Sequence, residues 1–405
     1  MSRSLIKSIR SSASISFTNA SRSNSARHAS TLFKQNKLPA AYYRGGTSRA
    51  ILFKQQDLPT DRSAWPSIFR GAIGSPDPNG RQLDGLGGGL SSLSKVCVVG
   101  ISSHADADVD YTFAALGIKN EDVDFSSNCG NMTSAIGPFA IDSGLVEPPA
   151  GGDGEAIVRI HNTNTRKIIH AKFPVVEGEA AAYGEFAIDG VSGTAAKIEL
   201  AFINPAGAKT GKLLPTGNVV DSLDGVDVTC IDAGNPCVFI QASDIGVDGT
   251  MLPDDIDIHP TLLARLDSIR RQASVAMGIS KDLESTPSSI PKIAMVSPPT
   301  SHKLLSGESI QGETVDLVVR ALSVGQPHRA VPITVAMAVA AAANLEGSTA
   351  NRNVGRERVD GDGITLGHPS GKILVGAKFD EEGSLTDATV FRTSRRLMEG
   401  VVYWK

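Results

Sequence analysis

The sequence predicts an α+β fold made of two similar halves, each wrapping a bent sheet around one central helix. Short apolar runs bounded by Gly, Pro, Asn and Asp dominate the chain, and several follow one another with no helix between them. Helical patterns are fewer, and this order of elements favours an α+β arrangement over a doubly wound parallel sheet. With 405 residues, 41% of them hydrophobic, the chain is long enough for two domains with cores of their own.

The expected helices carry apolar residues at helical spacing or on every face. In 260–277, Leu262, Leu266 and Ile269 recur as they would on one face of a helix. In 131–143 and 332–345, small and apolar residues occupy nearly every position, which is typical of a buried helix. Strands are expected at the short apolar runs 50–53, 95–100, 156–161, 197–202, 226–231, 238–241 and 372–377.

A faint internal repeat supports the prediction of two similar halves. Gly45-Gly46-Thr47-Ser48 precedes the first expected strand, and Ala233-Gly234-Asn235-Pro236 precedes the strand at 238–241. Each half then contains a buried helix opened by a polar turn, so we expect the two helix N-termini to face one another across a cleft. The predicted domains are 35–205 and 206–377, with 378–405 as a candidate to return to the first.

The first thirty residues have the composition of an organellar transit peptide. Their basic residues are interleaved with serines, and the first acidic residue of the whole chain is Asp57. A continuous apolar core of the secretory kind is missing. We therefore predict import into the mitochondrial matrix by residues 1–30; the alternative is a solvated tail. The basic residues are Arg3, Lys7, Arg10, Arg22 and Arg27.

Composition argues against several classes of partner. The net charge of −4 lacks the basic excess of nucleic-acid-binding domains. The longest nearly uncharged apolar run, 330–343, is shorter than the ~20 residues that span a bilayer. Four irregularly spaced cysteines are too few for a disulfide framework or a zinc site. We expect a reduced interior and no nucleic acid, membrane or metal partner; a homodimer is compatible with the sequence.

Lys95 follows a glycine-rich stretch that begins at Gly85. A phosphate-binding loop would need Gly directly before the lysine, where Ser94 stands, and a dinucleotide fingerprint fails because Leu90 replaces the third glycine. What remains is a loop that delivers Lys95 to the start of an apolar strand. A lysine among apolar walls loses solvation, which lowers its pKa and allows it to act as a base. An exposed lysine at a strand end is the simpler alternative.

Asn128-Cys129-Gly130-Asn131 opens the first buried helix. The unpaired N–H groups of a helix start can bind an anion, and they also stabilise a thiolate at that position. Cys129 is thus a candidate reactive thiol, or else a buried cysteine that only packs. The other cysteines lie in apolar runs or beside a proline, where packing is expected.

Hydroxyl, amide and guanidinium groups at four turns could bind a ligand with several carboxylates, because these groups donate hydrogen bonds to anions. Arg395 and Arg396 are expected on a solvated face. The candidates for binding are Thr47, Ser48, Gly130, Asn131, Arg329, Ser370 and Gly371.

Polar motifs recur along the chain in a fixed order: Arg44-Gly45-Gly46-Thr47-Ser48, Ser91-Ser92-Leu93-Ser94-Lys95, Asn128-Cys129-Gly130-Asn131, Asp232-Ala233-Gly234-Asn235-Pro236, His328-Arg329-Ala330, His368-Pro369-Ser370-Gly371 and Arg395-Arg396-Leu397-Met398-Glu399-Gly400. From about residue 38 to the end, this set resembles the 2-methylaconitate cis-trans isomerase family. That family includes aconitate and methylitaconate Δ-isomerases and lies within the diaminopimelate epimerase-like superfamily.

The resemblance implies strongly bent, mostly antiparallel sheets around the central helices and a metal-free isomerase of unsaturated tricarboxylates that needs no cofactor. The family's catalytic lysine falls on Lys95 and its cysteine on Cys129. Diaminopimelate epimerases carry a cysteine at the start of both central helices, whereas the second helix here opens with His328-Arg329-Ala330. We therefore expect a proton shift centred on lysine. Arg49 stands where relatives commonly carry Lys.

In the mechanism this implies, Lys95 removes an allylic proton, and the resulting anion is stabilised by the N–H groups of Gly130 and Asn131 and by Arg329. Rotation about the weakened bond and reprotonation then give the isomer, with Cys129 either returning the proton or only shaping the anion site. Two alternatives remain open: a cofactor-free amino-acid epimerase, and a non-catalytic tricarboxylate-binding accessory protein of an aconitase-like enzyme.

Overall fold

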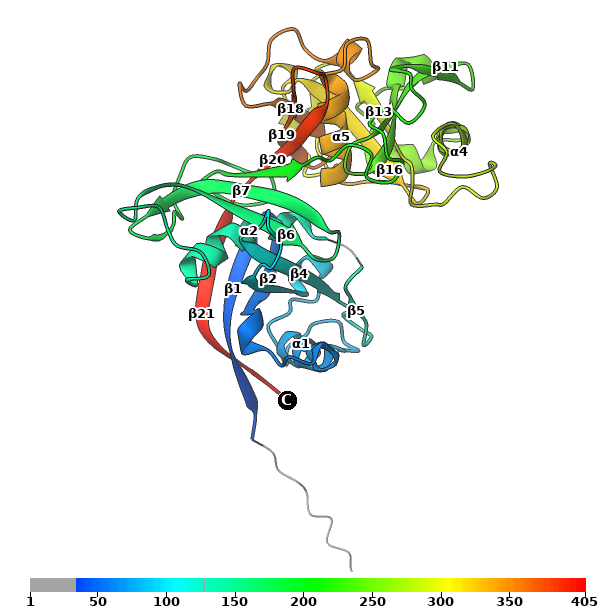
Figure 1. Cartoon of the computed structure of the whole chain (residues 1–405). Helices are drawn as coiled ribbons and strands as arrows, with labels where there is room; N and C mark the ends of the chain where they lie inside the picture. The colour runs from blue at the N-terminus through cyan, green and yellow to red at the C-terminus, as the bar shows by residue number, and fades with distance from the viewer. Residues whose placement is uncertain (1–33, 127) are drawn as a thin grey trace, which may run out of the picture. The chain divides into compact units, whose positions relative to one another are not determined.

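The computed structural model describes residues 34–126 and 128–405, of which 36–405 form one compact unit. The transit-peptide prediction for residues 1–30 lies outside the described residues. Among these, strands outnumber helices (Figure 1), and the predicted α+β class is confirmed. The α-helices are α1 (Trp65–Ile73), α2 (Gly130–Asp142), α3 (Pro253–Ile258), α4 (Leu262–Ala276) and α5 (Ile333–Ala343).

The strands fall into two series along the chain. The first comprises β1 (Asn36–Gly45), β2 (Ser48–Lys54), β3 (Lys95–Ile101), β4 (Val109–Leu116), β5 (Val123–Asp124), β6 (Gly154–Asn162), β7 (Lys167–Val176), β8 (Glu179–Ala180) and β9 (Ile198–Ile203). The second comprises β10 (Asp221–Leu223), β11 (Val226–Asp232), β12 (Pro236–Gln241), β13 (Lys292–Ser297), β14 (His302–Lys303), β15 (Ser309–Ile310), β16 (Leu317–Ser323), β17 (Gln326–Pro327), β18 (Ile364–His368), β19 (Gly371–Phe379), β20 (Leu385–Arg392) and β21 (Ser394–Trp404).

The two series share one pairing pattern. The hairpin β1–β2 is followed by parallel β3, antiparallel β4, parallel β6 and then antiparallel β7 and β9. The hairpin β11–β12 is followed in the same way by parallel β13, antiparallel β16, parallel β18 and antiparallel β19 and β20. The internal repeat seen faintly in the sequence is therefore a repeat of strand topology.

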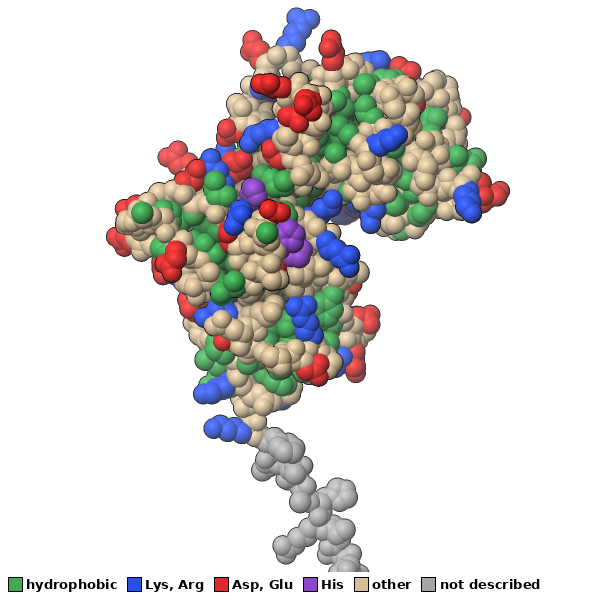
Figure 2. All heavy atoms as spheres, viewed as in Figure 1, with side chains coloured by type: hydrophobic (Ala, Val, Ile, Leu, Met, Phe, Trp, Pro, Cys, Tyr) green, Lys and Arg blue, Asp and Glu red, His purple; other side chains and the backbone are tan. Residues whose placement is uncertain are grey.

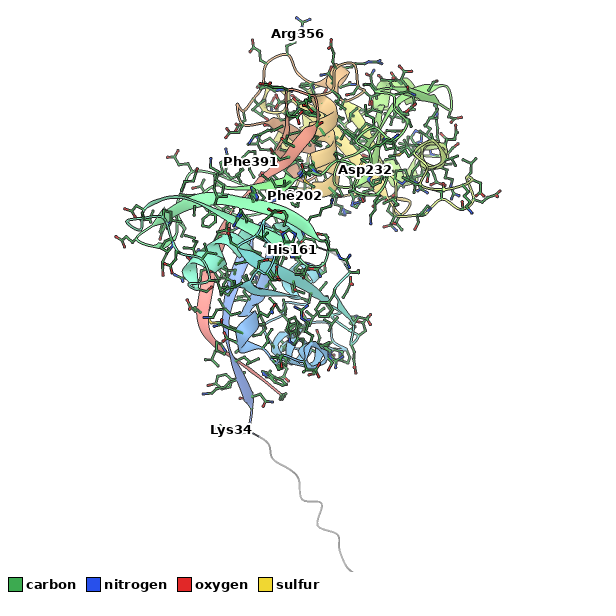
Figure 3. The ribbon with its side chains drawn as sticks, viewed as in Figure 1. Lys34, His161, Phe202, Asp232, Arg356 and Phe391 are labelled. Carbon is green, nitrogen blue, oxygen red and sulfur yellow. The ribbon has the colours of Figure 1, made fainter. Side chains whose placement is uncertain are left out.

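The two series are joined by their last strands. β20 pairs with β19 on one edge and with β9 on the other, so that Ala388 lies opposite Phe202. Figure 3 labels Phe202 and Phe391, which belong to these two strands. β21 then pairs antiparallel with β1 over most of its length. Because one continuous sheet and one compact unit include both series, the domain boundaries 35–205 and 206–377 stay a prediction.

The two central helices are buried on nearly every face, as their composition predicts. From Met132 to Ile141 every residue of α2 is buried, and so is every residue of α5 from Val335 to Ala343. α2 packs on β1, β2, β6 and β7, and α5 packs on β11, β12, β19 and β20 (Figure 1). Small side chains are needed here because the surrounding strands approach the helix axis from several directions.

Peripheral elements complete the unit. α1 packs its apolar face, including Phe69 and Ile73, on β2 and β3, and α4 covers the outer face of β13 in the same manner. None of the described helices is long and apolar enough to cross a membrane. On the face drawn in Figure 2, acidic and basic side chains are interspersed.

Candidate active site

Lys95 is held in place by the loop that precedes it. The side chain of Gln82, which is 1% exposed, accepts hydrogen bonds from the Ser94 hydroxyl (2.7 Å) and from the Gly89 N–H (2.9 Å). The Ser94 hydroxyl also donates to the Leu90 carbonyl. The glycine-rich loop is therefore folded around one buried amide, which fixes where β3 begins.

The Lys95 side chain lies on the inner face of the sheet, toward α2. As the first residue of β3 it shares this face with Cys97, because alternate residues of a strand point the same way. Its Nζ lies 5.6 Å from the centroid of the Phe113 ring, and the residue is half-buried. The structure thus places the predicted base against an aromatic wall and out of full contact with solvent.

Cys129 caps the N-terminus of α2. Its backbone is extended (φ −105°, ψ 99°), its carbonyl accepts from the Thr133 N–H (3.0 Å) and hydroxyl (3.1 Å), and its side chain is half-buried. Cys129 therefore lies at the helix start, where the first N–H groups of α2 have no partner within the helix.

Cys97 connects the two predicted catalytic residues. Burial holds the pKa of Cys97 well above its usual value, the neighbouring Cys129 raises this pKa further, and the neighbouring Lys95 lowers it. Its Sγ also lies 3.8 Å from the Tyr111 hydroxyl. Cys97 thus stays an inert, protonated thiol, and the structure brings Lys95 and Cys129 to the same buried neighbour.

A polar cluster adjoins this pair at the start of α2. Asn131 donates from Nδ2 to the Thr47 hydroxyl (3.0 Å) and accepts at Oδ1 from Arg392 Nε (3.3 Å). Thr47 is exposed, whereas the adjacent Ser48 is 3% exposed. Two predicted binding residues, Thr47 and Asn131, therefore meet one residue that the sequence did not reveal.

That residue, Arg392, is the last residue of β20. Burial lowers its pKa to about 10. Its described hydrogen bonds go to the Phe391 carbonyl (2.9 Å) and the Asn131 amide, both uncharged acceptors. The residue is half-buried, and its guanidinium is suited to an anionic ligand, because a cation with uncharged partners gains from a charge-assisted hydrogen bond. The sequence signal was an arginine that directly follows the apolar pair Val390-Phe391.

The helix starts of α2 and α5 lie in contact. A Cβ placed on Gly130, the first residue of α2, would lie 2.6 Å from Cδ1 of Ile333, the first residue of α5. A side chain at position 130 would therefore have to displace the end of the Ile333 side chain. Both helix N-termini carry partial positive charge, so their junction favours a bound anion.

Ser370 and Gly371 form a turn beside the approach to α5. The Ser370 hydroxyl donates to the Arg329 carbonyl (2.6 Å), and its N–H donates to His368 Nδ1 (3.2 Å). Gly371 has a φ of +141°, which other residues rarely adopt. The next residue, Lys372, donates its N–H to the carboxylate of Asp189. This turn already binds one carboxylate, from the segment between β8 and β9.

The structure does not bring the side chain of Arg329 to the polar cluster at Asn131, and its predicted role in substrate binding stays a prediction. Its guanidinium is 61% exposed and pairs with the Asp254 carboxylate at 3.2 Å, although its backbone carbonyl lies at the Ser370 turn. Ala330, Val331 and Pro332 separate Arg329 from α5, and its side chain pairs with Asp254 of α3. The cation found beside Asn131 is Arg392.

Two surface hollows, of about 620 and 690 Å³, are lined by other residues, among them Arg70 and Asp84 in one and Asp248 and His302 in the other. The candidate site is therefore defined by converging polar groups: Lys95, Cys129, Thr47, Asn131 and Arg392.

The fold and the polar groups gathered at the start of α2 agree with the isomerase class expected from the sequence. A family model described as "PrpF protein" matches residues 35–405, and the chain belongs to that family. The family resemblance, the fold and the isomerase class expected from the sequence are thereby confirmed.

Individual relatives agree with this assignment. A 2-methyl-aconitate isomerase of Shewanella oneidensis is 41% identical over 387 residues, covering 91% of this chain and 97% of the relative. A 3-methylitaconate isomerase of Eubacterium barkeri is 40% identical over 377 residues, covering 91% and 97%. The crystal structure of a methylitaconate-delta-isomerase superimposes with a TM-score of 0.83 at 39% identity, covering 91% of this chain and 96% of that chain.

Proposed function

We propose that this chain isomerises an unsaturated tricarboxylate, 2-methylaconitate or aconitate, by moving an allylic proton without a cofactor. The observation that carries the proposal is the convergence of Lys95, Cys129 and the Asn131–Arg392 pair at the start of α2. The relatives named for 2-methylaconitate and 3-methylitaconate support this substrate class.

The first step is removal of a proton. Direct rotation of a C=C bond is prohibitively slow, so its π character must be broken temporarily. The Lys95 amine takes a proton from an allylic carbon; that C–H bond breaks, and its electron pair delocalises over the neighbouring carbons onto a carboxylate. A positioned base of this kind contributes ~10²–10⁴-fold in rate.

Stabilisation of the resulting anion falls to fixed donors. The N–H groups of Gly130 and Asn131 point out of the start of α2, and the guanidinium of Arg392 lies beside them. Such preorganised donors act most strongly on charge that develops during the reaction. Thr47 and the Ser370–Gly371 turn are assigned to the remaining carboxylates. After rotation about the weakened bond, a proton returns to another carbon.

The direct test is an NMR assay of the protein against cis-aconitate, trans-aconitate, 2-methylaconitate and methylitaconate. The proposal predicts interconversion of at least one pair. Exchange of the α-proton of an amino acid, with no turnover of the tricarboxylates, would instead support a cofactor-free epimerase. Binding of tricarboxylates without any conversion would support an accessory protein.

We also propose a mitochondrial matrix location for the enzyme. The support is the acid-free, Arg- and Ser-rich composition of residues 1–30, which precede the family match that begins at residue 35. A fluorescent protein fused behind residues 1–35 should enter mitochondria, and the same fusion with Arg3, Lys7 and Arg10 replaced by Glu should not. Uniform cytosolic fluorescence of the first fusion would refute the location.

A further inference from the structure

The repeated strand topology gives Lys95 a counterpart in the second series of strands. β3 and β13 hold equivalent places, each parallel to the second strand of a hairpin and antiparallel to the strand that follows. Leu52 lies opposite Cys97 in one series, and Phe239 lies opposite Ala294 in the other, all four in the core around the central helices.

Each of the two strands begins with a lysine, two residues before its core residue. Lys95 precedes Cys97 in β3, and Lys292 precedes Ala294 in β13. Because side chains alternate along a strand, each lysine points to the same inner face as the core residue that follows it. Lys292 thus lies on the face of its sheet that forms the core around α5, as Lys95 lies on the face that forms the core around α2. Both lysines are half-buried.

The surroundings of Lys292 are polar on one side and apolar on the other. Cys237 lies directly opposite in β12 and is fully buried, which raises its pKa to about 12. In β16, Leu322 lies opposite Ile293, so Ser323 is next to Lys292 across the pair. The Ser323 hydroxyl and His328 Nε2 are hydrogen-bonded at 2.6 Å.

His328 lies near Lys292 and on the approach to α5. Burial and, secondly, the charge of Lys292 lower the pKa of His328. The backbone N–H of His328 donates to the Ala321 carbonyl (2.8 Å), which fixes the backbone between β17 and the start of α5. Lys292, His328 and Ser323 therefore form a cluster outside the site already described.

The two lysine clusters hold equivalent positions in the two series of strands, one series around each central helix. Lys95 and Cys129 belong to the start of α2, Lys292 and His328 to the start of α5, and Gly130 touches Ile333 where the two helices meet. From the repeated topology we infer that an anion bound at this junction would face one amine from each series.

We propose that Lys292 is the second proton-transfer group of the isomerisation, with His328 and Ser323 as its positioning residues. This inference rests on the proposed function. In one direction, Lys95 accepts the proton released from one end of the allylic system. The Lys292 ammonium donates a proton to the other end, where a C–H bond forms and Lys292 becomes an amine. Both half-buried amines then exchange protons with water, and the reverse reaction exchanges their roles.

The test separates proton removal from proton return. In D₂O, the variant Lys292→Met should still wash deuterium into the substrate position served by Lys95, within about threefold of the unmodified protein. Its net isomerisation should fall by ~100-fold or more, since one acid–base group is lost. Lys95→Met should lose both the deuterium exchange and the net isomerisation. The exposed Lys281→Met variant is the matched control and should lose neither.

Two results would overturn the assignment: net isomerisation by folded Lys292→Met within threefold of the unmodified protein, or equal loss of exchange and isomerisation. If Lys292→Met does not fold, Lys292→Arg keeps a cation that cannot release its proton near neutral pH and should show the same split. If the unmodified protein and Lys281→Met neither exchange nor isomerise, the proposed function itself fails, and this inference with it.

Discussion

At the scale of single residues, the site is built from groups whose environments differ although their chemistry is similar. Cys97 and Cys129 are near neighbours, yet Cys97 is fully buried in the core while Cys129 is half-buried at a helix start. Arg329 and Arg392 differ in the same way: the first pairs with Asp254 at the surface, and the second lies beside Asn131 with uncharged partners. We therefore infer the roles of these cysteines and arginines from their positions in the fold.

Replacing Arg392 should weaken substrate binding. In Arg392→Gln the guanidinium that faces Asn131 is lost, so we expect KM for the tricarboxylate to rise about 10–100-fold, as for loss of a charge-assisted hydrogen bond. Steady-state kinetics on Arg392→Gln measures the change in KM. Arg395→Gln, at an exposed position, is the control. An unchanged KM in Arg392→Gln would remove Arg392 from the site.

Replacing Cys129 by Ala should have a smaller effect. If the returning proton comes from Lys292, the thiol only shapes the anion site, and turnover should stay within about tenfold of the unmodified protein. A loss of 10³-fold or more in a correctly folded Cys129→Ala variant would instead assign the proton donor to Cys129.

At the scale of elements, the sequence predicted what depends on local pattern. The central helices were expected at 131–143 and 332–345 and occur at Gly130–Asp142 and Ile333–Ala343. Their all-round apolar composition is a local signal, as is the capping turn at Cys129. The glycine-rich loop before Lys95 was recognised, although its anchor, Gln82, was not.

What could not be predicted depends on contacts between distant segments. Arg392 reaches Asn131 across 261 positions of the chain, and no spacing rule connects two such residues. The partner of the Arg329 side chain could not be predicted for the same reason, because Asp254 comes from another helix. α1 was also missed, since its nine residues are a short apolar pattern.

The close approach of α2 and α5 makes position 130 sensitive to size. In Gly130→Ala the new methyl group would meet Ile333, so the two helix starts must separate or Ile333 must shift. We expect activity to fall at least tenfold and the free energy of unfolding to fall by about 1–3 kcal/mol, as for other overpacked positions.

Gly361→Ala provides the matched control, because a Cβ at that position meets nothing within 4 Å. Urea unfolding and isomerase assays of both variants decide the matter. If Gly130→Ala matches Gly361→Ala in both measurements, the contact between the helix starts does not constrain the site.

At the scale of the whole molecule, one continuous sheet connects two copies of the same topology through β9, β20, β1 and β21. The two proposed proton-transfer groups, Lys95 and Lys292, begin corresponding strands of the two series, so we expect the stability of the unit and the geometry of the site to be coupled. The oligomeric state, for which a homodimer is compatible with the sequence, is a separate question for solution scattering.

Acid should destabilise the fold partly through His368. Burial, followed by the charges of Arg320, Arg392 and His302, lowers the pKa of His368 from 6.5 to about 3. Below pH 6.5 the His368 side chain therefore binds a proton in the unfolded chain, whereas in the folded protein it stays neutral down to about pH 3. Stability should fall as the pH drops through this window, with a slope of about 1.4 kcal/mol per pH unit from this one group.

Urea unfolding at pH 4.5, 5.5 and 6.5 measures that slope. The variant His368→Gln should show a shallower pH dependence than the unmodified protein, because the group that titrates on unfolding is gone. Identical slopes would mean that the pKa of His368 is not depressed in the folded state.

The measurement that bears most directly on the mechanism follows the substrate C–H bond in D₂O by NMR, for the unmodified protein and for Lys95→Met. With the unmodified protein, deuterium should enter the allylic position of the substrate during isomerisation. With folded Lys95→Met the exchange should fall by ~10²–10⁴-fold, the contribution of a positioned base. Exchange at the unmodified rate in Lys95→Met would contradict the account, because another group would then be removing the proton.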